Sequence, residues 1–311
     1  MVLVISNRED ITTDWLVLEL QRRGAAYVRF NTEDYPQRCG LHWTPDSSYL
    51  EVGGSAVAAE EIHAVWYRRP VLPRVAPGLS AQDAAWATRE AAEALDGFWR
   101  TLNARWVSPP SAIRLAGSKL LQLRDAVGIG FEIPETLVSA SASHVEELLA
   151  RSPVGVICKP LSDGRVRSEG RSLLFTSLIT REDLVGLGDE PHLFQALVAK
   201  RYDVRVTVIG DEVFATRIEP RPGNVTAVDW RRMHPDTLCY HPETLPDALA
   251  AQCRQLLKHY RLSFGAIDLA RGHDGSYTFF EVNPNGQWAF IEQRTGQPLR
   301  AALADLLTGD E

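Results

Sequence analysis

A short polar pair, Asp274-Gly275, separates two apolar segments near the carboxyl end of the chain, residues 265–270 and 277–282. Asp-Gly between alternating apolar residues is one of the strongest local signals for a β-hairpin. A hairpin also fixes which residues face each other, because side chains alternate between the two faces of a sheet. The carboxyl-terminal part of the chain is therefore expected to contain an antiparallel sheet.

The predicted hairpin brings three polar side chains together. With a two-residue loop at Asp274-Gly275, Asp268 lies directly opposite Glu281, and Asn283 shares the face of Glu281. Facing carboxylates repel unless a cation lies between them. Two acids and an amide oxygen suit Mg²⁺, which takes its other ligands from water and phosphate. The alternative is a solvated sheet face, but these acids interrupt apolar strands, so we take them as candidate metal ligands.

A second predicted hairpin, formed by residues 204–209 and 213–218, carries basic residues. Arg205 lies on its polar face, and a three-residue turn at 210–212 places it opposite Arg217. Two facing guanidiniums call for an anion, and a phosphate suits them. The alternative is a pair of surface arginines whose apolar stems lie along the sheet.

Two lysines and one polar segment complete the candidate phosphate site. Lys159 ends the apolar strand 154–159, and Lys119 lies at the start of a helix predicted over 118–127. Residues 162–172 contain two glycines and three arginines. We expect this segment to be a mobile loop that either closes over phosphates or is simply solvated.

The whole chain has the composition of an ordinary globular protein: 311 residues, 45% hydrophobic and 23% charged. Its net charge of −7 argues against general affinity for nucleic acid or anionic membranes. No apolar run reaches the length of about 18 residues that a membrane span needs. The cysteines lack zinc-ligand spacing and the amino terminus lacks a signal-peptide pattern, so we expect a cytoplasmic protein.

The expected fold class is α/β, with α+β lobes. Strands and helices alternate in the first third of the chain, which predicts a mostly parallel sheet. The absence of G-x-G-x-x-G after the first strand argues against a dinucleotide site. Pro109-Pro110 marks the first boundary. We expect an amino-terminal α/β domain, a central α+β lobe and a carboxyl-terminal antiparallel-sheet lobe, comprising residues 1–110, 111–192 and 193–311 in turn.

In their order along the chain, these features resemble the ATP-grasp superfamily. Lys119 begins the middle lobe, and Lys159 ends a strand before the glycine-containing segment. The hinge segment 195–210 is similar to the Q-E-x-h…D-x-R-x-x-V-x-G pattern of RimK-like ligases, with Ala196 in place of the usual acid. The last feature is D…E-V-N-P-N. The resemblance implies an ATP-grasp fold that begins with a pre-ATP-grasp domain.

Three stretches resemble a narrower group, the graspetide synthetases, which cyclise ribosomally made peptides as in microviridin maturation. They are VWYRRP at 65–70, VDWRR at 228–232 and EVNPNGQWAFIE at 281–292. The resemblance covers nearly the whole chain. It implies an ATP-dependent ligase that phosphorylates Asp or Glu side chains of a precursor peptide and joins them to Ser, Thr or Lys side chains as ω-esters or ω-amides.

The same resemblance implies a role for each candidate residue. ATP and two Mg²⁺ ions would be the cofactors, with lysines on the α- and β-phosphates, the hinge at the adenine, and arginines at the γ-phosphate and acyl phosphate. Asp203 is expected near the ribose or the hinge. The lysines are Lys119 and Lys159, the hinge residues Gln195, Ala196, Leu197 and Val198, the catalytic arginines Arg205 and Arg217, and the metal ligands Asp268, Glu281 and Asn283.

The partners implied are a precursor peptide with leader and core segments, and a second copy of the chain in a homodimer. Residues 221–233 and 234–245 either contact the leader or form a plain surface excursion. Residues 66–69 either face an acidic core peptide or are strand packing with locally paired arginines.

Two other functions stay open. One is an ATP-grasp ligase for free amino acids or small peptides, because its chemistry is the same and only the acceptor region differs. The other is a catalytically silent, nucleotide-dependent peptide-binding module. The retained set of lysines, arginines, acids and asparagine argues against that second reading.

Overall fold

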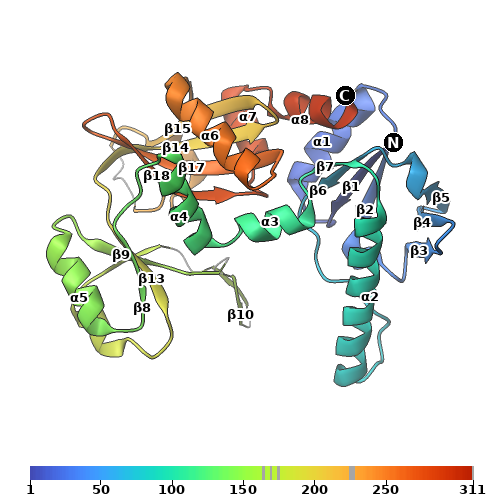
Figure 1. Ribbon diagram of the computed structural model, residues 1–311, viewed down its shortest axis with the longest axis horizontal. Helices are drawn as coiled ribbons and strands as arrows, with labels where there is room; N and C mark the ends of the chain where they lie inside the picture. Colours follow the sequence, from blue (N-terminus) through green and yellow to red (C-terminus); the bar gives the residue numbers. More distant parts are fainter. Residues whose placement is uncertain (163–164, 169, 174–175, 224–227, 310–311) are drawn as a thin grey trace.

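The computed structural model describes residues 1–162, 165–168, 170–173, 176–223 and 228–309. Figure 1 shows three parts: a blue and cyan amino-terminal part, a green and yellow middle part, and an orange and red carboxyl-terminal part between them. The mixture of helices with parallel and antiparallel sheets is the predicted α/β class with α+β lobes.

The amino-terminal part is built on a parallel sheet packed between helices. Its strands lie in the order β2-β1-β6-β7, and alternate residues of the first strand contact different helices, as a buried parallel strand requires. The bounds are β1 Val2–Ser6, α1 Ile11–Arg22, β2 Tyr27–Asn31, β6 Ala64–Tyr67, α2 Ala81–Thr101 and β7 Arg105–Val107. A small antiparallel sheet is inserted as β3 Gly40–Trp43, β4 Ser48–Val52 and β5 Ser55–Ala58.

The middle part is an antiparallel sheet in the order β12-β9-β13-β8, with one helix packed on it. In the segment predicted as a mobile loop at 162–172, residues 165–168 and 170–173 form two short antiparallel strands. Residues 163, 164 and 169 lie outside the described residues, and the predicted mobility stays a prediction. The bounds are α3 Pro110–Ala116, α4 Lys119–Ile129, β8 Thr136–Ser139, α5 Ala142–Arg151, β9 Val156–Lys159, β10 Arg165–Ser168, β11 Gly170–Leu173, β12 Ser177–Ile179 and β13 His192–Ala196. The domain boundaries at 110 and 192 stay predictions.

The carboxyl-terminal part is a five-stranded antiparallel sheet in the order β16-β15-β14-β17-β18. Its bounds are β14 Lys200–Ile209, β15 Glu212–Pro220, β16 Leu238–Glu243, α6 Asp247–His259, β17 Phe264–Gly272, β18 Tyr277–Asn283, α7 Ala289–Thr295 and α8 Leu299–Thr308. Short 3-10 turns occupy Thr32–Asp34, Ala59–Glu61, Glu182–Gly186, Trp230–Arg232 and Pro235–Thr237.

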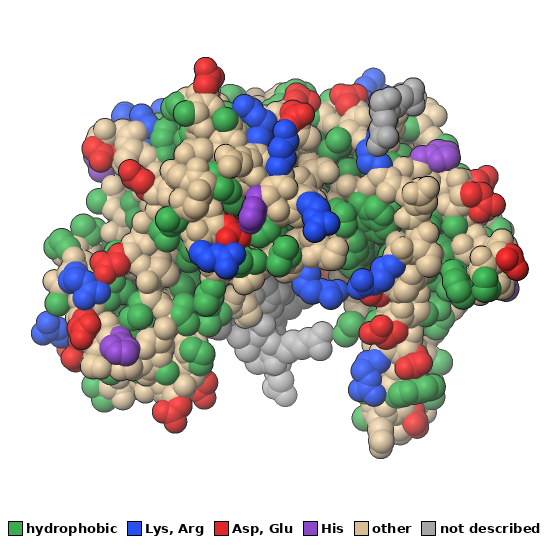
Figure 2. Space-filling model, viewed as in Figure 1, with side chains coloured by type: hydrophobic (Ala, Val, Ile, Leu, Met, Phe, Trp, Pro, Cys, Tyr) green, Lys and Arg blue, Asp and Glu red, His purple; other side chains and the backbone are tan. Residues whose placement is uncertain are grey.

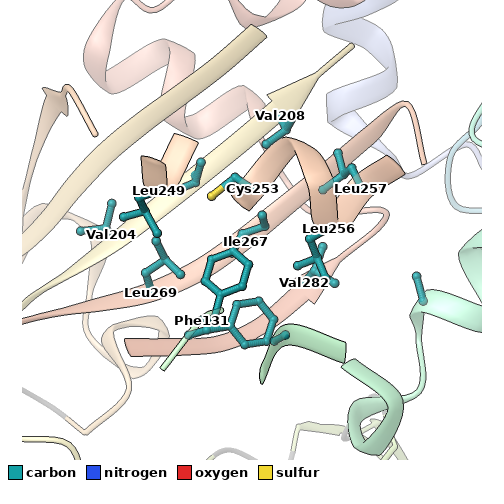
Figure 3. Packing of buried hydrophobic residues seen from close by; sticks show 14 of the residues in the cluster. Phe131, Val204, Val208, Leu249, Cys253, Leu256, Leu257, Ile267, Leu269 and Val282 are labelled. Carbon is teal, nitrogen blue, oxygen red and sulfur yellow. The ribbon is translucent and has the colours of Figure 1, made fainter. Parts of the chain in front are cut away.

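The two faces of this sheet have different chemistry because β14 alternates apolar and polar residues. Val204, Val206 and Val208 are buried against α6 in the largest apolar cluster, part of which Figure 3 shows. Arg205 and Thr207 point to the other face. The apolar side therefore anchors the sheet, and the polar side is available for a site.

The last helix returns to the first part of the chain. Leu299 and Leu303 of α8 pack with Leu16 and Leu20 of α1 and with Trp66 of β6. Within the residues that the structure describes, no helix is both long and apolar enough to cross a membrane.

Candidate active site

The hairpin of β17 and β18 places Asp268 opposite Glu281, so the predicted pairing is confirmed. The predicted two-residue turn is wrong. The Gly272 N–H donates to the Ser276 carbonyl at 3.0 Å, which leaves a three-residue loop. Phe280 is then an extra residue, a β-bulge that restores the pairing of Asp268 with Glu281.

The three predicted metal ligands share one face. Asn283 pairs with Ala266 two positions beyond Glu281, and its Oδ1 accepts the N–H of Asn285 at 2.9 Å. Cations already lie against both carboxylates: Arg205 Nη1 is 2.8 Å from Asp268 Oδ1, and Arg231 Nη1 is 3.2 Å from Glu281 Oε1. A carboxylate pair that recruits positive charge suits a divalent cation.

This donor set is compatible with Mg²⁺ but small. Among the described residues no group of three or more His, Cys, Asp or Glu side chains gathers in metal-binding geometry. The set is two carboxylates and one amide, which leaves most of an octahedron to water and phosphate oxygens, the usual pattern for magnesium on a nucleotide. Burial opposes ionisation of Glu281, but Arg231 and Lys159 outweigh it and lower the pKa of that carboxyl.

The structure does not bring Arg217 to Arg205, so that prediction is wrong. The turn between β14 and β15 has two residues, and Arg217 therefore pairs with Val204 rather than with Arg205. A shift of one residue moves a side chain to the other face. The Arg217 guanidinium lies 5.4 Å from the Tyr202 ring centroid, and its Nε is 3.5 Å from Glu219 Oε1.

Arg231 occupies the position that sequence reasoning gave to Arg217. Its guanidinium is 2.9 Å from Asp229 Oδ1 and also reaches Glu281. Although burial works against its charge, the neighbouring carboxylates raise the pKa of Arg231. The sequence signal that could have identified Arg231 is the VDWRR stretch at 228–232. In this stretch, which carries the family resemblance, Asp229 lies two residues before Arg231. The two interpretations of residues 221–233, leader contact or a plain surface excursion, both leave out this contact with Glu281.

The two lysines approach the same point from the middle part of the chain. Lys159 Nζ lies 4.9 Å from the Phe280 ring centroid, and burial lowers its pKa to about 8. Lys119 donates to the carbonyls of Pro160 and, at 3.1 Å, Ser162, so it holds the backbone that follows Lys159. Both ammonium groups are close enough to Glu281 to favour its charged form.

A cleft between the middle sheet and the carboxyl-terminal sheet joins these groups to the hinge. Lys200 Nζ is 2.8 Å from Asp203 Oδ1, and burial raises the pKa of Asp203 to about 6. Apolar side chains of Ile157, Leu197 and Phe280 line the hinge end, as a flat base requires. The cleft is lined by Ile157, Lys159, Thr176, Ala196, Leu197, Val198, Lys200, Asp203, Val228, Asp229, Trp230, Arg231, Asp268, Phe280 and Glu281.

Not every hinge residue faces this cleft. Gln195 is buried, and its amide nitrogen donates to Thr136 Oγ1 at 3.0 Å, away from the cleft lining. The backbone N–H groups of Ala196 and Leu197 donate to Glu135 and Gly155. Among the described residues, the N–H of Val198 has no acceptor, so this amide is available to a base.

The open face of the molecule is consistent with a large substrate. Figure 2 shows it hollowed between the middle part and α2, with Lys and Arg side chains along the upper margin of the hollow.

The chain is similar to known proteins in its amino-terminal sequence and in its fold. Residues 1–114 match the family described as the MvdD pre-ATP grasp domain. No curated protein sequence matches the chain.

Three solved structures are similar over nearly the full chain. Macrocyclase MdnC from Microcystis aeruginosa MRC, bound with precursor peptide MdnA, has 26% identity and a TM-score of 0.87, over 99% of both chains. A Chryseobacterium gregarium RiPP-associated ATP-grasp ligase, in complex with ADP and a leader and core peptide, has 26% identity and a TM-score of 0.87, over 98% of this chain and 96% of that one. Macrocyclase MdnB from Microcystis aeruginosa MRC has 28% identity and a TM-score of 0.82, over 99% of both chains.

Proposed function

We propose that this chain, an ATP-grasp ligase whose first part is similar to the MvdD pre-ATP grasp domain, is a graspetide synthetase. It uses ATP to phosphorylate Asp or Glu side chains of a ribosomal precursor peptide and joins them to hydroxyl or amine side chains. The observation that carries the proposal is the single cleft in which an apolar base pocket leads to Lys159, Arg231 and the paired Asp268 and Glu281.

The chemistry follows from the weakness of a carboxylate as an electrophile. Transfer of the γ-phosphoryl group of ATP to the substrate carboxylate gives an acyl phosphate and ADP. A substrate hydroxyl or amine then attacks the acyl carbon, phosphate leaves, and the peptide has lost one water in total. The enzyme's task is to position the reactants and stabilise negative charge, without a covalent nucleophile of its own.

The candidate residues in the cleft and next to it have the following roles in this scheme. Lys119 and Lys159 hold the α- and β-phosphates, and the hinge at Ala196–Val198 reads the adenine, with Asp203 beside it. Magnesium bound by Asp268, Glu281 and Asn283 would neutralise phosphate charge. We propose Arg205 and Arg231, in place of Arg217, as the groups that stabilise the transferring phosphoryl group.

The arginines of the site would exchange partners on nucleotide binding. Arg205 is paired with Asp268, and Arg231 is paired with Asp229 and Glu281. A metal ion held by Asp268 and Glu281 would compete for these carboxylates, and the two guanidiniums would then donate to phosphate oxygens. Both guanidiniums therefore already have carboxylate partners in the site.

A peptide acceptor is favoured over a free amino acid. The supporting observations are the hollow between the middle part and α2 and the likeness to macrocyclase MdnC, which was solved with a precursor peptide. The rival function is a ligase for free amino acids or small peptides. ADP release should be stimulated by the cognate precursor and not by free amino acids. Stimulation by free amino acids alone would replace our proposal with the rival.

We also propose that the protein forms a homodimer through the first half of α2. This half extends away from the rest of the part that carries it, as Figure 1 shows, and Trp86 is 57% exposed there. In an antiparallel pair of these helices with a twofold axis at Trp86, Asp83 of one copy faces Arg89 of the other, because each lies three residues from the centre. This charge complementarity favours a second copy of the chain as the partner. A cytoplasmic location without nucleic-acid partners stays a prediction.

A further inference from the structure

Arg68, at the end of β6, is a fully buried arginine far from the nucleotide cleft in sequence. Its side chain has 0% exposure, and its Nε lies 3.2 Å from Asp10 Oδ2, on a side chain that is only 2% exposed. An arginine and an aspartate buried together lose their hydration, and this is costly unless further hydrogen bonds satisfy the guanidinium. The hydrogen bonds of the Arg68 guanidinium therefore identify the part of the chain that it holds.

Two N–H donors of Arg68, one on each terminal nitrogen, reach the turn that follows Asn283. One donates to the backbone carbonyl of Asn285, and another donates to Gln287 Oε1 at 2.7 Å. Thr12, from the start of α1, donates its hydroxyl to the same Gln287 oxygen. The amino-terminal part therefore holds this turn from two elements.

The far side of the same turn contacts the proposed site. The N–H of Asn285 donates to Asn283 Oδ1 at 2.9 Å, so the residue that Arg68 binds also orients the Asn283 amide. Arg205 Nη2 donates to the Gln287 carbonyl at 3.4 Å. Gly286 packs closely against the Arg205 guanidinium, because a Cβ added at Gly286 would lie 2.6 Å from Arg205 Nη2.

We infer that Arg68 is a positioning residue for the phosphate and metal site, acting through the turn 284–288. It fixes the orientation of Asn283 and Arg205 from the opposite lobe, and so couples the amino-terminal part to the chemistry without touching substrate. The inference rests on the proposed function of Asn283 and Arg205. Groups that orient metal ligands typically change metal affinity or activity by about 10- to 100-fold when they are replaced.

The experiment measures ADP affinity of Arg68→Lys by calorimetry, once with excess Mg²⁺ and once with a chelator. Lysine keeps the charge beside Asp10, but its compact ammonium group cannot reproduce the planar fork with which the guanidinium reaches Asp10, Asn285 and Gln287 together. We expect the Mg²⁺-dependent gain in ADP affinity to fall by about 10-fold or more, with metal-free ADP affinity within a few-fold of wild type. A general loss of stability would weaken both measurements together.

Arg105→Lys is the matched control. Arg105 also crosses from the amino-terminal part to the carboxyl-terminal part, donating to the Leu307 carbonyl at 3.1 Å, but at α8 rather than at the site. It should keep the wild-type Mg²⁺ gain. If Arg68→Lys fails to fold, Gln287→Met removes the side-chain acceptor and leaves the pair with Asp10 intact, and a smaller loss of the same kind is expected.

An unchanged Mg²⁺ gain in a folded Arg68→Lys or Gln287→Met protein would overturn the inference and leave the proposed function standing. A wild-type protein that binds ADP no better with Mg²⁺ than without it would instead sink the proposed metal site. The two failures are thus distinguishable in one set of titrations.

Discussion

At the scale of single residues, the arginines differ in the face of the strand that each occupies. Arg205 and Arg217 both lie on the same hairpin, yet only Arg205 contacts Asp268. Arg231 reaches Glu281 from a short 3-10 turn rather than from a strand. Because Arg231 contacts the paired carboxylates and Arg217 does not, the same substitution is expected to affect the two arginines differently.

Arg231→Met should lower ATP turnover by two orders of magnitude or more, whereas Arg217→Met should retain turnover within a few-fold of wild type. The size of the first loss follows from removing a donor that stabilises developing charge, which typically costs about 10²- to 10³-fold. Peptide-stimulated ADP release under saturating ATP checks both variants. Equal losses in the two variants would mean that Arg217 reaches the site after all.

At the scale of secondary-structure elements, alternation was predictable and register was not. The polar and apolar faces of β14 follow from the period of two residues, whereas the pairing of Asp268 with Glu281 depends on the register. The bulge at Phe280 could not be predicted from the sequence. The turn is one residue longer than predicted and the strand has one extra residue, and these two differences cancel in the pairing of Asp268 with Glu281. No such cancellation occurs between β14 and β15, so the same kind of error moved Arg217 to the wrong face.

The site was predictable where residues act through a local pattern. Asp268, Glu281 and Lys159 interrupt or end apolar strands, and that is visible in the sequence. Arg231 was missed because its segment has no period that predicts a strand or helix. Arg68 was left between two roles, since burial depends on contacts made by the turn at 284–288, more than two hundred residues away.

The end of α1 offers a test of stability at this scale. Glu19 accepts hydrogen bonds from Arg22 and Arg23, which lower its pKa to about 2, and Arg23 also joins Asp305 of α8. A carboxyl group whose pKa is lowered by folding stabilises the folded state at pH values above its unfolded-state pKa. This stabilisation is lost as the pH falls through the folded-state pKa.

Glu19→Gln should therefore reduce the free energy of unfolding at pH 7 by about 1–2 kcal/mol, a value reduced for the solvent exposure of Arg22. The difference from wild type should shrink from about pH 4.5 downward and vanish near pH 2. Urea unfolding across this range makes the comparison. A difference that is constant with pH would assign the effect to packing rather than charge.

At the scale of the whole molecule, three sheets share one site. The middle and carboxyl-terminal sheets form the cleft, and the amino-terminal part reaches it through Arg68 and the turn after Asn283. The last helix, α8, packs on α1 and so ties the end of the chain to its beginning. Changes in how the lobes sit together are therefore expected to reach the site through that turn.

Self-association can be tested by exchanging charges on α2. Asp83→Arg and Arg89→Asp should each weaken the dimer, because like charges then face each other across the twofold axis, while the double variant should restore it. Sedimentation velocity over a range of concentrations gives the oligomeric state. Trp86→Glu should yield a monomer, and a wild-type protein that is monomeric throughout would remove the proposed interface.

The most direct measurement is mass spectrometry of the cognate precursor peptide after incubation with the enzyme, ATP and Mg²⁺, with ADP measured in the same sample. We predict a loss of one water for each ADP formed, and no loss with Glu281→Ala, which removes half of the carboxylate pair. ADP formation that leaves the peptide mass unchanged, or a mass loss that Glu281→Ala retains, would contradict acyl-phosphate ligation at this site.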